Sequence, residues 1–527
     1  MTDCDVLVLG AGPNGLGISG LLAKDGFKVI TLEKNNHVGG LASNSHFWPG
    51  YTHNTGAWWL SIDKIQPVWK ALDLDKYCPE TYKPPGMGTT LGIDSNAKPH
   101  HMIFDPEKQM ARIRADFGQD AAVALGKIFR YFEPFSMGVQ PMLNNPPISI
   151  GQLMDRMPSV EAKATLNQAF YGMAADLIDE YFPDKEKTGA LRGTLAATAA
   201  DGFWGGPMTP GSLLKFAYQV ATHSGGAVPA LVKGGIGKFS EALAEGYKAI
   251  GGQLRLNSEV KKIILEKGKA TGVELVNGDL ITARYVISSL DTANTFLRLV
   301  GEEKIPPLVA KQIKRINYRC HFMQAFCRCS GVPQYKGKLE YFNSEGWNWC
   351  AGYWPTLELM EQCWDDVKMG RIPEKAVGAY SCMSMLDPSL APAGKHTMTV
   401  FTNYTWPQGV PADKVDEVKE ICFQRIVDSL SELAPNFRDI IDEHVVMAPP
   451  DYEKRFNNTG GDWAHGQIQL SQLFDNRPIQ GMSGYKVPFI NNMWLCGSSN
   501  HPGPGVTFIP AINCLNVFKK ELGIGKK

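Results

Sequence analysis

Three glycines near the N-terminus have the spacing that binds a phosphate group. The pattern G-x-G-x-x-G is formed by Gly10, Gly12 and Gly15, with Pro13 and Asn14 between them. The first glycine allows a sharp turn, the second lets a pyrophosphate approach the backbone, and the third lets a helix pack closely. Further along, Glu33 can accept hydrogen bonds from ribose hydroxyls, which favours a free 2′-hydroxyl over a 2′-phosphate. Together these residues predict a dinucleotide-binding site.

The residues around this motif predict the elements that position it. Residues 6–9 are four consecutive apolar residues, which is typical of a strand buried on both faces of a parallel sheet. A helix is expected from about residue 14 to 24, with its positive N-terminal end aimed at the phosphates. A second strand over 28–32 ends directly before Glu33. The fold class that follows is α/β, with a Rossmann-type nucleotide-binding domain.

A second pair of glycines follows the predicted ribose ligand. After Glu33-Lys34 come Gly39 and Gly40, which offer a second close approach of the backbone to a ligand that extends past its phosphates. The spacing Glu-Lys-x-x-x-x-Gly-Gly resembles a signature of the flavoprotein superfamily that includes amine oxidases and phytoene desaturases. The resemblance implies FAD as the cofactor. It continues through Leu41, Ala42 and the sequence Asn54-Thr55-Gly56, where Asn replaces the Asp of that family.

Two later segments resemble the remaining FAD-binding parts of this superfamily. In the middle of the chain we expect a helix over 239–250, a hairpin turning at Asn277-Gly278 and a buried strand over 285–289. In this segment the resemblance assigns the backbone of Val260 to the adenine. Near the C-terminus, a strand over 493–497 precedes a turn with Gly497, Gly505 and Val506, and then a helix over about 507–522. A helix dipole at this position stabilises a reduced flavin ring.

The C-terminal motifs carry the closest resemblance. The pattern Gly-Asp-x-x-His-Gly begins at Gly461, and Cys-Gly-Ser-Ser-x-His-Pro-Gly-x-Gly-Val begins at Cys496. Together with Gln-Leu-Phe and Asn-Arg-Pro between them, these motifs resemble the phytoene desaturase branch, nearest to β-carotene ketolases and the pyridine nucleotide–disulfide oxidoreductase-like proteins. The implied fold is a glutathione reductase-like FAD-binding domain with an inserted mixed α+β substrate domain.

This interpretation divides the chain into five segments. We expect FAD-binding segments at 1–95, 228–300 and 455–527, a helical part of the substrate domain at 96–227, and a part with sheet and helices at 301–454. The substrate part is rich in tryptophan, with Trp347, Trp349, Trp354, Trp364 and Trp406. Together with Trp58, Trp59 and Trp204, these side chains suggest an apolar substrate that is flat or elongated.

Composition excludes several other classes. The chain has 53 Lys+Arg and 53 Asp+Glu, so it offers no basic field for a nucleic acid. Its 11 cysteines include no C-x-x-C pair, which predicts reduced thiols and no metal site. We expect no signal peptide, no apolar run of about 18 residues that could span a membrane, and a cytoplasmic location. Peripheral contact with a membrane and homo-oligomerisation stay open.

The expected chemistry is hydride transfer between flavin N5 and a carbon of an apolar substrate. The enzyme would then be a desaturase, a saturase, a ketolase or an isomerase. His465 and His501 are the candidate catalytic residues, because both lie in motifs expected to face the ring and histidine titrates near neutral pH. Gln472 and Arg477 either fix a loop or bind substrate. Asp201 is a weaker candidate, because an Asp before Gly is typical of a turn.

No second G-x-G-x-x-G follows a strand, so we expect no separate NAD(P)H domain. Electrons would then pass to oxygen or a quinone, or return to the substrate in an isomerisation. One alternative function is a flavin amine oxidase that oxidises a C–N bond. A second is a non-catalytic flavin-binding protein that acts through interaction with partners.

Overall fold

The first of two seven-stranded sheets in the computed structural model is centred on β1 (Cys4–Leu9), and the structure describes residues 2–90, 98–223 and 229–524. β1 pairs in parallel with β2 (Val29–Leu32) on one side and with β12 (Leu280–Ser288) on the other. Five of its six residues are buried, as the apolar run predicts for a strand covered on both faces. The sheet is completed by β9 (Gln253–Arg255), β10 (Val260–Glu266), β11 (Lys269–Leu275) and β18 (Met493–Leu495).

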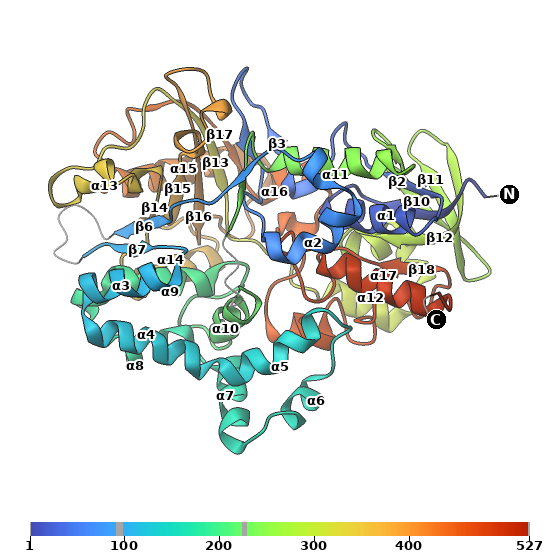
Figure 1. The fold of residues 1–527 in the computed structure, drawn as a ribbon, viewed down its shortest axis with the longest axis horizontal. Coiled ribbons are helices and arrows are strands. Elements are labelled where there is room, and N and C mark those ends of the chain that lie inside the picture. Colours follow the sequence, from blue (N-terminus) through green and yellow to red (C-terminus); the bar gives the residue numbers. More distant parts are fainter. Residues whose placement is uncertain (1, 91–97, 224–228, 525–527) are drawn as a thin grey trace.

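Helices from both ends of the chain cover one face of this sheet. The helix after β1, α1 (Pro13–Lys24), contacts α2 (Ile62–Ala71), α11 (Ile236–Ala249) and α17 (Ile509–Glu521). The π-helix η3 (Asn294–Gly301), which contacts β10, and α12 (Pro307–Lys314) belong to a second hydrophobic cluster of this domain. Figure 1 shows α1, β2, β18 and α17 in the same half of the molecule, although they come from opposite ends of the sequence. The α/β class with a Rossmann-type sheet is therefore confirmed.

The second sheet lies in the other half of the molecule (Figure 1). Its strands, in spatial order, are β17 (Ile441–Met447), β13 (Gln324–Cys329), β16 (His396–Asn403), β15 (Val377–Ser381), β14 (Cys350–Tyr353), β6 (Met87–Thr90) and β7 (His100–Met102). β6 pairs in parallel with β14, so the chain has already crossed to the second sheet before residue 95. The predicted segment boundaries near residues 95 and 227 themselves lie outside the described residues.

A helical layer packs against the second sheet, through contacts to β6 and β7. Its members are α3 (Pro106–Phe117), α4 (Gln119–Tyr131), α5 (Glu133–Leu143), α6 (Ile150–Asp155), α7 (Val160–Tyr171), α8 (Ala174–Tyr181), α9 (Lys185–Ala200) and α10 (Ser212–His223). α10 contacts α5, α7, α8 and α9, which makes it the central helix of this layer. The helices share one hydrophobic cluster with loops from the C-terminal part of the chain, including Phe474.

Eight further strands and α-helices belong to the described part of the chain. They are β3 (Asn44–Ser45), β4 (His53–Asn54), β5 (Thr81–Tyr82), β8 (Leu231–Val232), α13 (Tyr341–Ser344), α14 (Leu357–Lys368), α15 (Val415–Ser431) and α16 (Pro449–Phe456). Among the described residues, none of the helices combines the length and the apolar composition needed to cross a bilayer.

The tryptophans of the second half pack in cores. Trp347, Trp349, Trp354, Trp364 and Trp406 are all at most 9% exposed and belong to hydrophobic clusters. They stabilise the fold by burying large apolar surfaces, so they do not support the inference about a substrate that the sequence suggested. Trp58, Trp59 and Trp204 are only partly buried and remain available to line a site.

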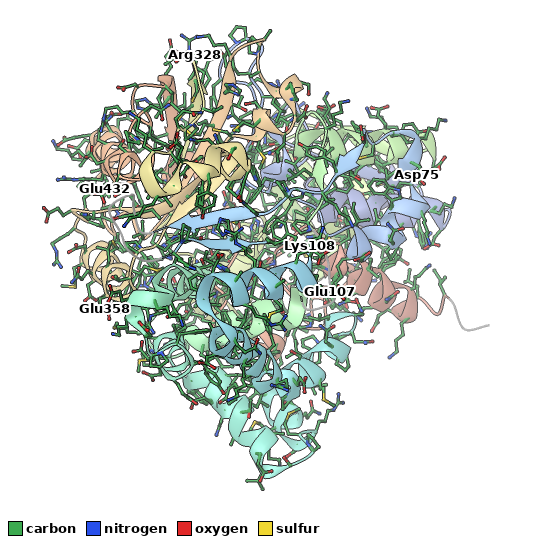
Figure 2. All side chains as sticks on the ribbon, turned by 60° about the vertical axis from the view of Figure 1, so that its left-hand side comes forward. Asp75, Glu107, Lys108, Arg328, Glu358 and Glu432 are labelled. Atoms are coloured by element: carbon green, nitrogen blue, oxygen red, sulfur yellow. The ribbon has the colours of Figure 1, made fainter. Side chains whose placement is uncertain are left out.

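Charged side chains lie mainly at the outer surface. Figure 2 shows Arg328, Glu358 and Glu432 projecting from the molecule. Arg328 pairs with Glu443 at 2.8 Å, and Glu432 pairs with Lys375 at 3.1 Å, both in exposed positions. Because exposed ion pairs contribute little to stability, the apolar clusters hold the fold together.

Candidate active site

The turn after β1 is shaped to receive a pyrophosphate. The Gly10 amide donates a hydrogen bond to the Leu32 carbonyl at 2.8 Å, and its φ of +91° favours glycine. A Cβ atom on Gly15 would lie 2.0 Å from the Gly10 carbonyl oxygen, so α1 can begin this close to the turn only with glycine there. No atom lies within 4 Å of the corresponding position at Gly12. This open space beside the N-terminus of α1 fits an anionic group.

Glu33 ties this turn to the end of β2. One carboxylate oxygen accepts a hydrogen bond from the Ala11 amide at 3.0 Å, and the other accepts from the Asn35 amide at 3.0 Å. An ionised carboxylate has about four acceptor positions, so Glu33 can hold the turn and still accept from a ribose hydroxyl. The residue therefore has a structural role besides the predicted binding role.

The second glycine pair lies against the first turn. The Gly39 amide donates to the Ala11 carbonyl at 2.9 Å, and a Cβ on Gly40 would lie 3.7 Å from the Gly12 Cα. The segment after this pair is held by the chain around Gly56, because the Ala57 amide donates to the Leu41 carbonyl and the Thr55 amide donates to the Ser43 carbonyl, both at 2.9 Å. Position 56 also requires glycine, because a Cβ atom there would lie 2.9 Å from the Leu41 carbonyl oxygen. The two predicted glycine motifs thus lie side by side, and we refer to the expected path of the cofactor along them as the groove.

The segment before Val260 is brought beside Glu33. The Ser258 amide donates to the Glu33 carbonyl at 2.8 Å, and the Asn257 amide donates to the Asn35 carbonyl at 3.0 Å. Val260 then begins β10 next to the ribose end of the groove, where the resemblance placed the adenine.

The Lys34 side chain points away from the expected cofactor site. Its ammonium donates to the Asn457 side chain at 2.9 Å and to the Lys454 carbonyl at 3.2 Å.

The C-terminal glycine loop closes the other end of the groove. The Asn14 side-chain amide donates to the Ser498 hydroxyl at 3.2 Å, which joins the first turn to the loop after β18. A Cβ on Gly497 would lie 2.2 Å from the Ser289 carbonyl oxygen. Val506 has a positive φ of +53°, and α17 begins at Ile509, two residues later than predicted. The loop before α17 therefore lies beside the N-terminal part of α1.

Arg477 joins the two histidine-containing loops. Its side chain is 1% exposed and donates to the carbonyls of Ala464 at 2.7 Å, Gly466 at 2.9 Å and Ser498 at 2.8 Å. Burial lowers the pKa of Arg477, although the acidic Asp462 nearby counteracts this effect. Of the two roles that the sequence left open, these contacts support loop fixation.

His465 and His501 occupy different environments. His465 has a positive φ of +52° and keeps partly accessible surface. Burial lowers its pKa to about 4, with Asp291 opposing the effect, so the imidazole is neutral at pH 7. His501 is fully buried, and its Nε2 donates to the Met142 carbonyl at 3.0 Å. The geometry favours His465 for contact with a ligand and gives His501 the task of positioning its loop.

The sequence did not predict the residue that shapes the His465 loop. The carboxylate of Asp462 accepts hydrogen bonds from the amides of Ala464 at 3.0 Å and Gly466 at 2.9 Å. Its third partner is the side chain of Gln467, which donates at 3.0 Å. Burial raises the pKa of Asp462 to about 6. The motif Gly-Asp-x-x-His-Gly contained the signal, because an Asp can bind amides a few residues further on.

Replacing Gly12 by valine should block FAD binding without unfolding the protein. The backbone at Gly12 has φ −70°, which valine adopts readily, and the new side chain enters only open space. A pyrophosphate can no longer approach the turn. We expect the affinity for FAD, measured by fluorescence titration, to fall about a hundredfold, or roughly 2.7 kcal/mol. The melting temperature of the FAD-free protein should not change.

Two further variants control this experiment. Gly126→Val on α4 meets equally open surroundings and should bind FAD normally. Gly15→Val should instead destabilise the fold, because its side chain collides with the Gly10 carbonyl. Wild-type affinity in Gly12→Val would show that the pyrophosphate does not lie at this turn.

Substitution of the two histidines should have distinguishable effects. His465→Asn keeps a residue that tolerates positive φ, so we expect normal melting but a changed absorption spectrum of the bound FAD. His501→Asn leaves the Met142 carbonyl unpaired, which should cost about 1–3 kcal/mol of stability and leave the spectrum unchanged. The reverse pattern would contradict the assignment of His465 to the ligand-facing surface.

Two family models match this chain. A model described as "NAD(P)-binding Rossmann-like domain" matches residues 8–73, and one described as "Flavin containing amine oxidoreductase" matches residues 150–324. The first covers the glycine turn, the ribose acid and the second glycine pair. The second begins at α6 and ends at β13.

Curated relatives and solved structures agree with these models. The chain is 26% identical to pyridine nucleotide-disulfide oxidoreductase domain-containing protein 2 of Mus musculus, over 98% of this chain and 94% of that protein. It is 24% identical to prolycopene isomerase 2 of an Oncidium hybrid cultivar, over 99% of this chain and 85% of the isomerase. Among solved structures, an oxidoreductase from Methanosarcina mazei has a TM-score of 0.59 at 14% identity and covers 98% of this chain and 100% of its own.

Amine oxidases share the fold as well. A putrescine oxidase structure aligns with a TM-score of 0.58 at 15% identity, over 98% of this chain and 99% of the oxidase. The groove between the glycine loops, the flavin-containing family model and the relatives point to the same class of protein. The chain is similar to proteins of the amine oxidase/phytoene desaturase superfamily, and it is a flavin-dependent oxidoreductase with FAD as its cofactor.

Proposed function

We propose that the protein transfers a hydride between the flavin and a carbon atom of an apolar substrate, with an isoprenoid or a polyene as the expected class. The supporting observation is the apolar surface on which the C-terminal loops rest. Ile468, Leu473 and Phe474 belong to the same hydrophobic cluster as α5, α7 and α10. The partly buried Trp58, Trp59 and Trp204 pack against that cluster. A hydrocarbon bound beside the flavin would therefore contact apolar side chains.

A small cavity supports the same class of substrate. It lies where the FAD-binding region meets the second sheet, and its lining includes Gly56, Trp58, Gln324, Tyr380 and Phe401. Its volume of about 30 Å³ holds roughly one water molecule. A substrate would have to move side chains to enter, and the partly buried Trp58 is the clearest candidate. Apolar and aromatic residues predominate in the lining, which suits a hydrocarbon better than a cation.

The names of two relatives point to substrates of this kind. One of the subunits of limonene dehydrogenase from Castellaniella defragrans is 23% identical, over 99% of this chain and 95% of its own length. Its name and that of the prolycopene isomerase both refer to hydrocarbons. In our proposal the electrons pass to oxygen or a quinone, or return to the substrate when the reaction is an isomerisation.

The chain's own residues would orient the reaction. When bound, FAD supplies the acceptor or donor of the hydride. Asp462 and Arg477 fix the loop of His465, whose neutral imidazole would orient the bound ligand through a hydrogen bond. The N-terminus of α17 would stabilise the negative charge of a reduced ring.

Oxidation of an amine is the second candidate, because putrescine oxidase shares the fold. That reaction predicts an aromatic cage, with two rings facing each other across a gap. Trp58 and Trp59 instead stack on each other, with ring centroids 4.7 Å apart and planes at 28°. No substrate fits between them in this arrangement. This pair therefore supports the hydrocarbon proposal over the amine one.

The proposal predicts which compounds reduce the flavin. The FAD-loaded protein is mixed anaerobically with phytoene, prolycopene or limonene in detergent micelles, and with putrescine or cyclohexylamine in buffer. We expect at least one hydrocarbon to bleach the flavin absorbance and both amines to leave it unchanged. Dithionite provides the control for complete reduction.

Other outcomes would favour the alternatives. Bleaching by an amine, with release of peroxide in air, would identify an amine oxidase. A flavin that dithionite bleaches but no compound of either class reduces, combined with no isomerisation of prolycopene, would favour the non-catalytic flavin-binding protein.

A further inference from the structure

We propose that Asp201 is the catalytic base of the reaction, with Lys215 as the positioning residue that keeps it ionised. The proposal rests on the proposed function, because it assigns the proton that must leave when a hydride is removed from the neighbouring carbon. Asp201 directly follows α9, and Lys215 lies on α10. Neither residue takes part in the FAD groove described above.

Asp201 is a carboxylate without a partner. It is densely surrounded by protein atoms, yet the residue keeps partly accessible surface. Within the described parts of the chain, its side chain forms no hydrogen bond and no ion pair. Burying a carboxylate in this way is costly, and proteins retain such groups mainly at functional sites.

The end of α9 makes this position more unusual. Asp201 occupies the C-cap of α9, where the negative end of the helix dipole disfavours a carboxylate. Lys215 is 2% exposed, and its ammonium donates to the Thr198 carbonyl at 3.3 Å, which is one of the last carbonyls of the same helix. It also donates to the Gln219 side chain at 2.9 Å. A buried cation therefore lies at this helix end, close enough to act on Asp201 electrostatically without touching it.

The loop that carries Asp201 is held rigidly. The His321 Nε2 donates to the Phe203 carbonyl at 3.0 Å, and the Tyr404 hydroxyl donates to the Gly205 carbonyl at 2.8 Å. The Met208 amide donates to the Glu361 carboxylate at 2.8 Å. These contacts all hold residues that follow Asp201 and none involves its carboxylate, so a rigid loop carries an unpaired carboxylate.

This loop borders the one that carries His465. The Ile468 amide donates to the Gly202 carbonyl at 2.8 Å, and a Cβ on Gly202 would lie 3.1 Å from the Trp463 indole. One turn after Lys215, the Tyr218 hydroxyl donates to the Pro502 carbonyl at 2.7 Å, within the other flavin-facing loop. The segment of Asp201 and the helix of Lys215 therefore each contact one of the two loops that would enclose the flavin ring.

The proton and electron balance of a desaturation fits this placement. A C–H bond on one carbon breaks, and its hydrogen leaves with both electrons to the oxidised flavin. The C–H bond on the adjacent carbon breaks as its proton passes to a carboxylate oxygen of Asp201, and its electron pair forms the new C=C bond. Asp201 then returns the proton to solvent. A saturation runs through the same steps in reverse.

Several charged or titratable groups face Asp201. Lys215 lowers its pKa, while burial raises it. Tyr404 and Cys320 lie close enough to sense its charge, and His321 and Glu361 hold the same loop. A base must be deprotonated, so the rate should rise with pH through the pKa of Asp201. Removing the charge of Lys215 raises that pKa, which should move this limb of the profile to higher pH.

The test follows the rate of anaerobic flavin reduction by phytoene across pH. Asp201→Asn should slow reduction at least about a hundredfold while FAD stays bound, and Asp201→Glu should restore part of the rate. Lys215→Met should shift the acidic limb to higher pH, an effect that a merely structural role would not produce. Asp120→Asn on α4 and Lys163→Met on α7 are exposed controls and should match the wild type. The proposal would be overturned if the flavin of the Asp201→Asn variant were reduced at the wild-type rate. It would also be overturned if the pH profile of the Lys215→Met variant showed no shift.

A second measurement separates this proposal from the proposed function. If no hydrocarbon reduces the wild-type flavin, the proposed function fails, and the flavin reduction potential then tests the placement of the pair. Asp201→Asn should raise the potential and Lys215→Met should lower it, because each removes a charge beside a ring that becomes negative on reduction. Unchanged potentials in both variants would overturn the placement.

Discussion

The structure depends on how closely the backbone of α1 approaches the end of β1. A Cβ on Gly15 would lie 2.0 Å from the Gly10 carbonyl oxygen, so this approach requires glycine. It places the first amides of the helix next to the turn and leaves the space at Gly12 open. The second glycine pair and the C-terminal loop are then fixed against the same turn, by the Gly39–Ala11 and Asn14–Ser498 hydrogen bonds. One local constraint thus gathers segments from both ends of the chain around one groove.

Long-range polar contacts give the groove its far wall. Arg477 is a buried cation whose two Nη atoms donate to backbone carbonyls, and it holds the loops of His465 and Ser498 together. Asp462 shapes one of these loops from inside. Buried charges are costly unless they are hydrogen-bonded, so these two residues define the conformation of the loops more than they add stability. The apolar helical layer beneath supplies a surface that suits a hydrocarbon.

Sequence patterns predicted the parts of the fold that depend on local constraints. The Rossmann elements, the hairpin at Asn277-Gly278 and both glycine motifs follow from turn chemistry and apolar runs. The place of β6 in the second sheet could not be predicted from such patterns, because this short strand pairs with β14, which lies far along the chain. The difference between His465 and His501 also depends on a distant contact, namely the Met142 carbonyl. Lys34 matched a motif, yet its side chain turns toward Asn457.

The central claim is that the separate glycine loops bind a single FAD molecule in one extended conformation. An experimental structure of the FAD complex tests this claim most directly. We expect the adenosine beside Glu33 and Val260, the pyrophosphate over Gly12, and the isoalloxazine ring between the loops of His465 and Gly505. A flavin bound outside this groove, or bound with its adenine toward α17, would contradict the claim.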